Sequence, residues 1–530
     1  MSKKANRIPY LLIVTFLLSL FSKSPITAGP NTDTQVEKTA STSSLYTLGS
    51  EIRVSEDADP EPQRSYTAVA YNDKQDEYLV VWSNEWLDGH KDVYARRVES
   101  DGNLLSQFSV ATGAGDKYDP AVIFNSVAEE YLVVWLYTPP VGGNTNEVWG
   151  RLVSWDGATL APEFKIVSWP DRKFADLSVA WNSNLDQYLV VWGATDAAGW
   201  NLDVSSMLLA ANGDIITGRN LTTSNQPFDP DVVYNPVTNE YFVVYTTFTF
   251  TTQQDIMGLR VKADNSVIDP PGEISIVSYN VGESEPSVAT NGKNNYAVVW
   301  QSWIDSDYDI YGQRLDFNGS KPWNWDSYAL IKNINETHPD IAYDGHDTYL
   351  ITWQQFDSPV FSVRAQSRDF ATDTREFFDV ASDAVLPVVA AGASQFLVAY
   401  QGIYPSGGSD YKHIFGRYLY EFFETTCTPV TSLTVTGPTA GQTGSSHIFQ
   451  VDNLAPLNVT FPIIYTWSPT PDNQSGNSAT YSWSTEGVKT ITATGSNCAG
   501  SGSANDDHTI TISADGAGAK IYLPLIMNMK

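Results

Sequence analysis

The stretch Tyr78-Leu-Val-Val-Trp82 decides the fold of this 530-residue chain, because it recurs at a nearly fixed interval. Further copies of the phrase, some of them looser, run over 131–135, 188–192, 241–245, 296–300, 349–353 and 396–400. The closing aromatic residues (82, 135, 192, 245, 300, 353 and 400) are 53, 57, 53, 55, 53 and 47 residues apart. Such a period predicts one structural unit per copy, and the units are called repeats 1 to 7 below.

Repeats 1 to 6 each contain four short segments that favour strands, and repeat 7 contains the first three of them. The first follows an acidic residue and Pro in several repeats, as in Asp119-Pro120 and Asp229-Pro230. The second is the repeated phrase, which is apolar on both alternating faces, as expected of a strand with both faces buried. The third begins with an acidic residue, as in Asp92-Val-Tyr-Ala, and the fourth is weak, as in Phe164-Lys-Ile166. Four strands per repeat of about 50 residues predict the blades of a β-propeller.

The two ends of the repeat region are complementary. Repeat 7 has no fourth strand after residues 413–419, whereas Glu51-Ile-Arg-Val54 precedes repeat 1, where a fourth strand would lie in any other repeat. An N-terminal strand that completes the last blade would remove two exposed sheet edges. We therefore predict an all-β chain whose residues 48–422 form a seven-bladed propeller closed by its N-terminal strand.

The composition excludes some partners. The chain carries 61 acidic and 31 basic residues, a net charge of −30. Nucleic acid is not expected as a partner, because its phosphates would be repelled. An acidic surface is typical of a soluble exported protein.

The N-terminus predicts export. Lys3, Lys4 and Arg7 precede the apolar stretch 10–21, and Ile26-Thr27-Ala28 offers a small-residue cleavage site. This pattern predicts a signal peptide over 1–28, too short to remain as a membrane span, followed by a disordered leader over 29–47. We expect no transmembrane segment after its removal, and a secreted or cell-surface location.

A second domain is predicted over 427–514, where Thr, Ser, Gly and Pro become frequent. Six short strand patterns in this stretch indicate a β-sandwich of the immunoglobulin type. Tyr465-Thr-Trp467 and the stretch 487–497 resemble the polycystic-kidney-disease (PKD) modules of bacterial extracellular proteins, although the Asp-Phe-Gly-Asp-Gly stretch of that family is missing. The resemblance implies a spacer or adhesion module without catalysis. The repeats themselves resemble uncharacterised secreted bacterial propellers in strands such as Asp309-Ile-Tyr-Gly-Gln-Arg314, which implies a fold and no activity.

The only two cysteines, Cys427 and Cys498, both fall in this second domain. In an exported chain this predicts a disulfide, the alternative being two buried thiols. Residues 515–530 form a linker and a short apolar tail that includes Ile521 to Met527. The tail is either a processing or retention signal or an additional strand of the sandwich, and seven apolar residues cannot cross a bilayer.

The loops between the second and third strands are the predicted binding face. Each carries an aromatic residue, and such a ring could stack on sugar rings or simply cap the ends of the blades. These residues are Trp86, Tyr137, Trp200, Phe248, Trp303, Phe356 and Tyr404.

Acidic residues suggest two further sites. Asp119, Asp229, Glu285 and Asp340 lie at the first strands, and a pair of them at suitable spacing could serve a glycosidase. Their recurrence in several repeats favours a structural role, so no catalytic residue is assigned. Asp305, Asp307 and Asp309 place alternate carboxylates on one loop, which suits Ca²⁺. No other cofactor is expected.

These observations predict an exported binding or adhesion protein whose propeller face recognises a polysaccharide or a surface protein, with the sandwich as a spacer. The alternative is an extracellular carbohydrate-active hydrolase or lyase that uses the same face. Propellers serve all of these functions, so the fold alone does not separate them.

Overall fold

The computed structural model describes residues 46–514, except 57–61, 141–144, 197, 199, 223–225, 250–252, 269–271, 279–280, 305–306, 322–327, 330–334, 347, 370–374, 407–408, 422–428, 457–462, 476 and 498–501. The predicted signal peptide, most of the predicted leader, both cysteines, Asp305 and the apolar tail lie outside the described residues. The chain divides into two compact units, one up to residue 422 and the other from residue 423.

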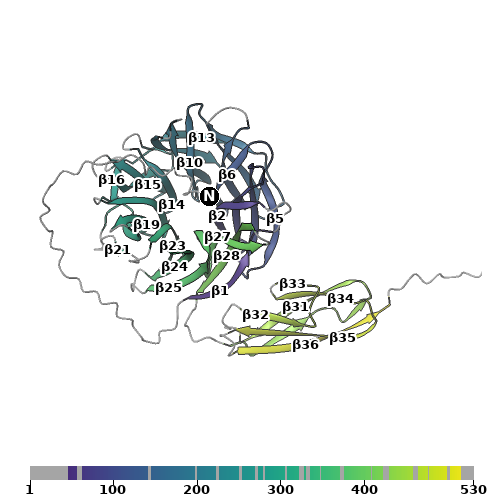
Figure 1. The fold of residues 1–530 in the computed structure, drawn as a ribbon. Helices are drawn as coiled ribbons and strands as arrows, with labels where there is room; N and C mark the ends of the chain where they lie inside the picture. Colours follow the sequence, from purple (N-terminus) through teal and green to yellow (C-terminus); the bar gives the residue numbers. More distant parts are fainter. Residues whose placement is uncertain are drawn as a thin grey trace, which may run out of the picture. The chain divides into compact units, whose positions relative to one another are not determined.

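The first unit consists of antiparallel sheets of four strands, and seven such sheets are present among its described residues (Figure 1). Repeat 1 forms the sheet of β2 (Gln63–Asn72), β3 (Glu77–Glu85), β4 (Lys91–Glu99) and β5 (Leu104–Ala111). Repeat 2 forms the sheet of β6 (Asp116–Asn125), β7 (Glu130–Thr138), β8 (Glu147–Ser154) and β9 (Phe164–Ser168). Repeat 3 forms the sheet of β10 (Arg172–Asn182), β11 (Gln187–Asp196), β12 (Asn201–Ala210) and β13 (Ile215–Asn220). Repeat 4 forms the sheet of β14 (Phe228–Asn235), β15 (Glu240–Thr249), β16 (Gln253–Lys262) and β17 (Glu273–Val277). Repeat 5 forms the sheet of β18 (Gly282–Thr290), β19 (Asn295–Ile304), β20 (Asp307–Asp316) and β21 (Tyr328–Ala329). Repeat 6 forms the sheet of β22 (Asn335–Tyr343), β23 (Thr348–Asp357), β24 (Val360–Asp369) and β25 (Arg375–Ser382).

The sheet of repeat 7 takes a strand from the other end of the unit. Its own strands are β26 (Ala384–Ala391), β27 (Gln395–Ser406) and β28 (Ser409–Glu421), and β1 (Tyr46–Arg53) is the fourth. β1 pairs antiparallel with β28, with Glu51 opposite Arg417. The segment that the sequence marked as a displaced fourth strand therefore lies in this sheet, and β1 begins two residues earlier than the predicted start of the propeller.

The apolar phrase is buried because each second strand is covered on both faces. In repeat 2, Tyr131, Val133 and Trp135 share a core with side chains of repeat 1. The intervening Leu132 and Val134 share a core with repeat 3. Successive side chains of a strand point to opposite faces, so five apolar residues serve two neighbouring sheets at once.

The same packing joins the first and last repeats. Tyr78, Val80 and Trp82 of repeat 1 share a core with Leu397 and Ala399 of repeat 7. The first strands β2, β6, β10, β14, β18, β22 and β26 each contact the next, and β26 also contacts β2. Figure 1 shows these sheets arranged around a common centre, the arrangement of a β-propeller.

In repeats 3 and 5, the tyrosine that opens the phrase also bonds to the preceding repeat. Asn125, the last residue of the first strand of repeat 2, donates to the Tyr188 hydroxyl of repeat 3 at 2.8 Å. Asn235 donates to the Tyr296 hydroxyl at 3.1 Å in the same way. A buried hydroxyl without a partner would cost stability, so the asparagine that ends a first strand and the tyrosine of the following repeat support each other.

The second unit contains two four-stranded sheets with one hydrophobic core, which includes Phe449, Trp467 and Ile491. The first sheet has the order β29 (Ser432–Thr436), β31 (Ser446–Ala455), β34 (Ser478–Ser482), β33 (Asn473–Ser475). The second has the order β30 (Ala440–Gln442), β36 (Gly502–Ser513), β35 (Gly487–Asn497), β32 (Ile464–Ser468). Across the described parts of both units, no helix has the length and apolar character needed to span a membrane.

Candidate functional site

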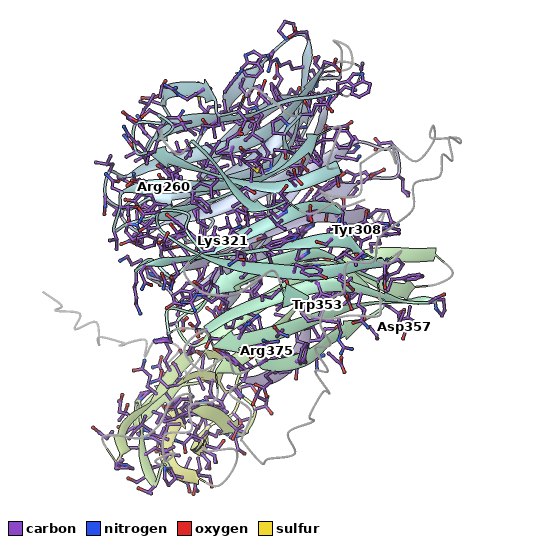
Figure 2. All side chains as sticks on the ribbon, turned by 90° about the vertical axis from the view of Figure 1, so that its left-hand side faces the viewer. Arg260, Tyr308, Lys321, Trp353, Asp357 and Arg375 are labelled. Atoms are coloured by element: carbon purple, nitrogen blue, oxygen red, sulfur yellow. The ribbon has the colours of Figure 1, made fainter. Side chains whose placement is uncertain are left out.

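The loops between second and third strands lie on one side of the first unit. Figure 2 shows the ring from its edge, with Tyr308 and Asp357, which flank these loops in repeats 5 and 6, toward one side. Lys321, which follows the third strand of repeat 5, lies toward the other side. This arrangement follows from the antiparallel order of the strands, since successive connections lie alternately at opposite ends of the strands. The side with Tyr308 and Asp357 is called the loop face below.

Three of the predicted aromatic residues are exposed on the loop face. Trp200, Phe248 and Trp303 are 54%, 37% and 45% exposed and belong to repeats 3, 4 and 5, which are consecutive. The Trp303 ring meets Tyr308 edge to face, with 4.8 Å between ring centroids. Large aromatic side chains held partly in water at neighbouring positions can stack on a ligand with an apolar face.

The other predicted aromatic residues are packed more closely. Trp86 donates to the Asp92 carboxylate at 3.0 Å and stacks on His90. Tyr137 meets Trp149 edge to face at 5.4 Å, and Phe356 lies 4.5 Å from the ring of Phe361. Tyr404 falls in β27, but its side chain lies outside the described residues. The structure thus separates three exposed rings from three that are only partly exposed.

The acid-Pro pairs of the first strands occupy a β-bulge. In every repeat, one first-strand residue has a positive φ, between 50° and 60°, and the pairing with the second strand shifts at that point. The residues are Tyr66, Asp119, Asp176, Asp229, Glu285, His338 and Leu386. Pro follows in five of them. Asp is among the residues that tolerate this backbone conformation best, so its recurrence has a structural cause.

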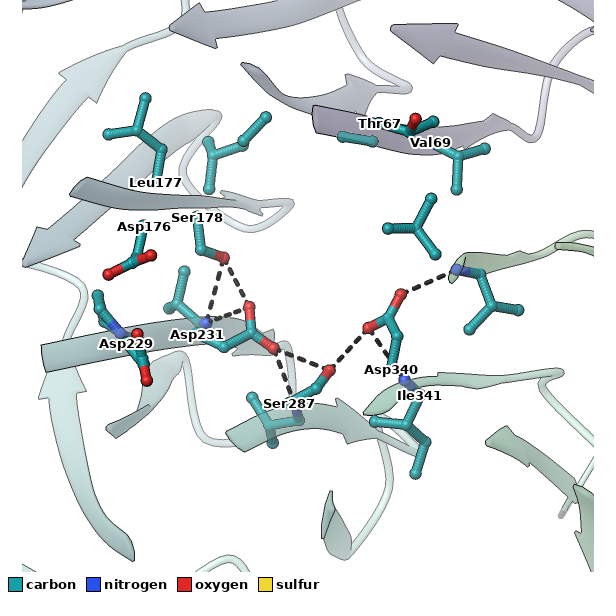
Figure 3. Close-up of a pocket in the computed structure, with 18 of the residues that line it drawn as sticks. Thr67, Val69, Asp176, Leu177, Ser178, Asp229, Asp231, Ser287, Asp340 and Ile341 are labelled. Atoms are coloured by element: carbon teal, nitrogen blue, oxygen red, sulfur yellow. Dashed lines mark hydrogen bonds between the residues drawn. The ribbon is translucent and has the colours of Figure 1, made fainter. Parts of the chain in front are cut away.

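The bulges line a cavity of about 350 Å³ along the axis of the ring. Two residues after the bulge, the side chains are Ser178, Asp231, Ser287 and Asp340 in repeats 3 to 6, whereas repeats 1, 2 and 7 have apolar residues there. The wall of the cavity is therefore polar on one side and apolar on the other (Figure 3).

The axial carboxylates hold the inner strands together. Asp231 accepts hydrogen bonds from the amides of Val232 in its own strand and Val288 in the next, both at 2.9 Å. Ser178 also donates to it at 2.7 Å. Asp340 likewise accepts from Ile341 at 3.0 Å and from Val389 of the following repeat at 2.8 Å. Carboxylates occupied by main-chain amides act as braces, and they are poorly placed to transfer protons to a ligand.

The predicted calcium residues lie near a buried glutamate that the sequence analysis missed. Asp307 accepts from the amide of Tyr308 at 2.9 Å, and Asp309 is 7% exposed. Glu336 of repeat 6 is fully buried, and burial raises the pKa of its carboxyl to about 8, with Asp309 and Asp307 contributing. Within the described residues, no three or more His, Cys, Asp or Glu side chains are grouped so as to hold a metal ion.

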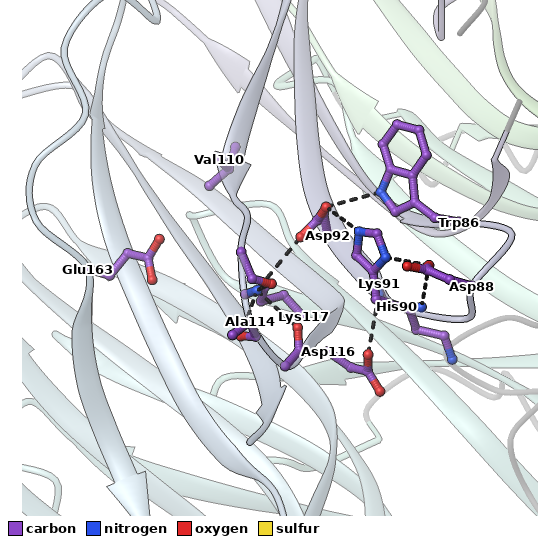
Figure 4. A network of polar contacts seen from close by, with 12 residues as sticks. Trp86, Asp88, His90, Lys91, Asp92, Val110, Ala114, Asp116, Lys117 and Glu163 are labelled. Atoms are coloured by element: carbon purple, nitrogen blue, oxygen red, sulfur yellow. Dashed lines mark hydrogen bonds and ion pairs between the residues drawn. The ribbon is translucent and has the colours of Figure 1, made fainter. Parts of the chain in front are cut away.

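A second polar network joins repeats 1 and 2 on the loop face (Figure 4). His90 contacts Asp88 through one ring nitrogen and lies 3.3 Å from Asp92 through the other. The bond from His90 lowers the pKa of the exposed Asp88 carboxyl. The buried Asp92 also lies 3.7 Å from the ammonium of Lys117, which belongs to the next repeat. Only the long-range packing of repeats brings Lys117 there, so no local pattern indicated it.

Comparisons with known proteins find distant structural likenesses. No protein-family profile matches the sequence, and no curated protein matches it. A protein of unknown function from Dyadobacter fermentans DSM 18053 is similar with a TM-score of 0.45 and 11% identity, over 71% of this chain and 100% of that one. The polysaccharide lyase Uly1 is similar with a TM-score of 0.44 and 9% identity, over 71% and 100%. The β-propeller domain of the Trilobed protease from Pyrococcus furiosus is similar with a TM-score of 0.40 and 10% identity, over 67% and 95%. Likenesses at this level carry no inference about activity.

Proposed function

We propose that this chain is an exported polysaccharide-binding protein. In this proposal, residues 1–28 direct secretion, the first unit is a seven-bladed propeller closed by β1, and residues 427–514 form a PKD-like spacer. The pairing of β1 with β28 and the shared core of repeats 1 and 7 support the closure. The two sheets of the second unit around one core support the spacer. The disulfide between Cys427 and Cys498 remains part of the proposal.

The exposed rings of the loop face carry the proposal. Trp200, Phe248 and Trp303 come from consecutive repeats and keep about half or a third of their surface in water. A sugar ring has an apolar face that stacks on such side chains, while its hydroxyls suit polar groups between them. Rings spaced around consecutive repeats suit an extended chain of sugars better than a single small molecule.

The axial cavity gives little support to the hydrolase alternative. Two of the four aspartates that line it, Asp231 and Asp340, each accept hydrogen bonds from main-chain amides of two repeats. A glycosidase needs one carboxyl to donate a proton and another to attack or to activate water. Among the axial side chains whose hydrogen bonds are given above, no two carboxyl groups are available for these two roles.

The test is a panel of immobilised polysaccharides offered to the purified mature chain, with retention and released reducing ends scored together. We expect retention of the protein by at least one polysaccharide, without release of sugar ends. Release of sugar ends would replace the proposal by the hydrolase or lyase alternative. Retention by none would contradict the proposal and direct attention to a surface protein as partner.

A further inference from the structure

The rings of the loop face in repeats 4 to 6 follow the register of the sheets. Phe248, Trp303 and Phe356 each lie three residues after the closing aromatic residue of their second strand. Across the ladder to the third strand they are paired with Gln254, Tyr308 and Phe361. The three positions are therefore structurally equivalent, and they recur once per repeat.

Each of these rings lies on the sheet face that is turned toward the following repeat. In repeat 5, Val299 packs in a core shared with repeat 6, and Trp303 stands four residues later in the same strand. In repeat 6, Leu350 packs in a core shared with repeat 7, and Phe356 stands six residues later. Because side chains alternate along a strand, each ring shares the face of that core residue. Phe248 has the same relation to repeat 5, so the rings mark three successive boundaries between repeats.

Repeat 6 adds exposed aromatic surface that the sequence analysis missed. Phe361 is 38% exposed, and its ring centroid lies 4.5 Å from that of Phe356. The equivalent pair in repeat 5, Trp303 and Tyr308, has 4.8 Å between ring centroids. Figure 2 shows Tyr308 and Asp357, the residue after Phe356, toward the same side of the ring of repeats. The aromatic surface of the loop face therefore continues from repeat 5 into repeat 6.

The loops that carry these rings are acidic. The stretches 246–256, 301–310 and 354–363 contain five aspartates and no Lys or Arg. One of these aspartates, Asp357, is exposed at the end of β23. A ligand group with a negative charge would therefore be repelled along this part of the loop face.

Basic side chains near the loop face are placed elsewhere. Lys91 and Lys117 belong to repeats 1 and 2, and their ammonium groups lie 5.6 and 5.8 Å from the centroids of tyrosine rings. Arg364 follows the loop of repeat 6 but is paired in the ladder with the buried Trp353, and it forms an ion pair with Asp379. A chain laid along repeats 4 to 6 thus meets aromatic rings and carboxylates from these loops.

We propose that the loop face binds an uncharged polysaccharide lengthwise along repeats 3 to 6, with Phe361 as a further binding residue. This inference rests on the proposed function and names the class of its ligand. An uncharged sugar offers an apolar face to a ring, and its hydroxyls can donate to a carboxylate such as Asp357. A polymer repeats its units as the protein repeats its rings, so each further stacked sugar strengthens the same binding event.

The first experiment compares glucans, mannans, xylans and arabinans with alginate, pectate and dextran sulfate as immobilised ligands of the mature chain. We expect retention by an uncharged member and not by the anionic ones. The retained polysaccharide is then converted to its carboxymethyl derivative and, as a control for bulk, to its hydroxyethyl derivative. The carboxymethyl derivative should bind at least about tenfold more weakly than the hydroxyethyl one, and the difference should shrink in high salt because salt screens repulsion.

The second experiment measures affinity for the retained polysaccharide in variants of repeat 6. Phe361→Ala should weaken binding by about fivefold to tenfold, the loss expected for one stacked ring. Phe361→Tyr keeps a ring and should bind as the wild type does. Phe377→Ala is the matched control, because Phe377 is 50% exposed in the same repeat but lies on the outer strand β25. Thermal unfolding checks that all three variants are folded.

Oligosaccharides cut from the retained polysaccharide test the lengthwise arrangement. Wild-type affinity should rise with their length, and Phe361→Ala should remove part of that rise. Retention by alginate, pectate or dextran sulfate in place of the uncharged members would overturn this inference and leave the polysaccharide-binding proposal standing. Equal affinity of Phe361→Ala and Phe377→Ala would overturn the role of Phe361, and retention by no polysaccharide would overturn both proposals.

Discussion

At the residue scale, the acidic side chains of the first unit differ in role because their surroundings differ. Asp231 faces the axial cavity and accepts main-chain amides from two repeats. Glu336 has no exposed surface and no such donor among the residues that the structure describes. The first acid is satisfied by main-chain amides, while burial and neighbouring acids raise the pKa of the second and favour its protonated form. Residue type alone therefore does not say which acid is structural and which could bind a ligand.

The brace formed by Asp231 leads to a prediction about stability. Asp231→Ala removes the acceptor of two main-chain amides and of the Ser178 hydroxyl, so we expect a loss of about 2 kcal/mol in the free energy of unfolding. Ser287→Ala removes only a hydroxyl, which donates to Asp340 on the same polar wall of the axial cavity, and should cost about half as much. Denaturant unfolding followed by tryptophan fluorescence measures both. If both variants lost a negligible free energy of unfolding, these axial hydrogen bonds would not stabilise the inner strands.

At the element scale, the second strands were predictable and the first strands were only partly so. The phrase that opens with Tyr78 predicts a strand buried on both faces, and β3 and its counterparts have that burial. The acid-Pro pairs did not reveal the positive φ at the bulge, because in repeats 1 and 7 a tyrosine and a leucine adopt the same conformation. The bulge arises from a shift in the pairing between the first and second strands. The composition of the first strand alone does not reveal that shift.

The bulge of repeat 7 allows a direct test of this view. Leu386 has a φ of 60°, which a leucine side chain tolerates poorly. Leu386→Asn should leave Tm unchanged or raise it slightly, since Asn tolerates this conformation. Leu386→Ile adds branching at Cβ and should cost about 1–2 kcal/mol. Thermal unfolding of the two variants decides the matter, and an isoleucine variant as stable as the asparagine variant would contradict the assigned strain.

At the scale of the whole first unit, the periodic phrase predicted the repeats, and the displaced strand predicted where the ends meet. β1 lies in the sheet of repeat 7, and Tyr46 at its start donates to Asp344 of repeat 6 at 2.9 Å. The candidate sites were less predictable. Loop aromatics could be located in the sequence, but the exposure of Trp200 and Trp303 and the packing of Trp86 depend on neighbours far along the chain. Glu336 could not be assigned at all, because its acidic neighbours lie in another repeat.

The measurement that tests the central claim most directly is the affinity of single-ring variants for the polysaccharide retained in the panel. Trp200→Ala and Trp303→Ala should each weaken binding by about tenfold, the loss expected for one stacked ring. Phe377→Ala removes an aromatic side chain that is 50% exposed on β25, an outer strand, and should bind as the wild type does. Unchanged affinity of both tryptophan variants, with all variants folded, would contradict the assignment of the loop face as the binding surface.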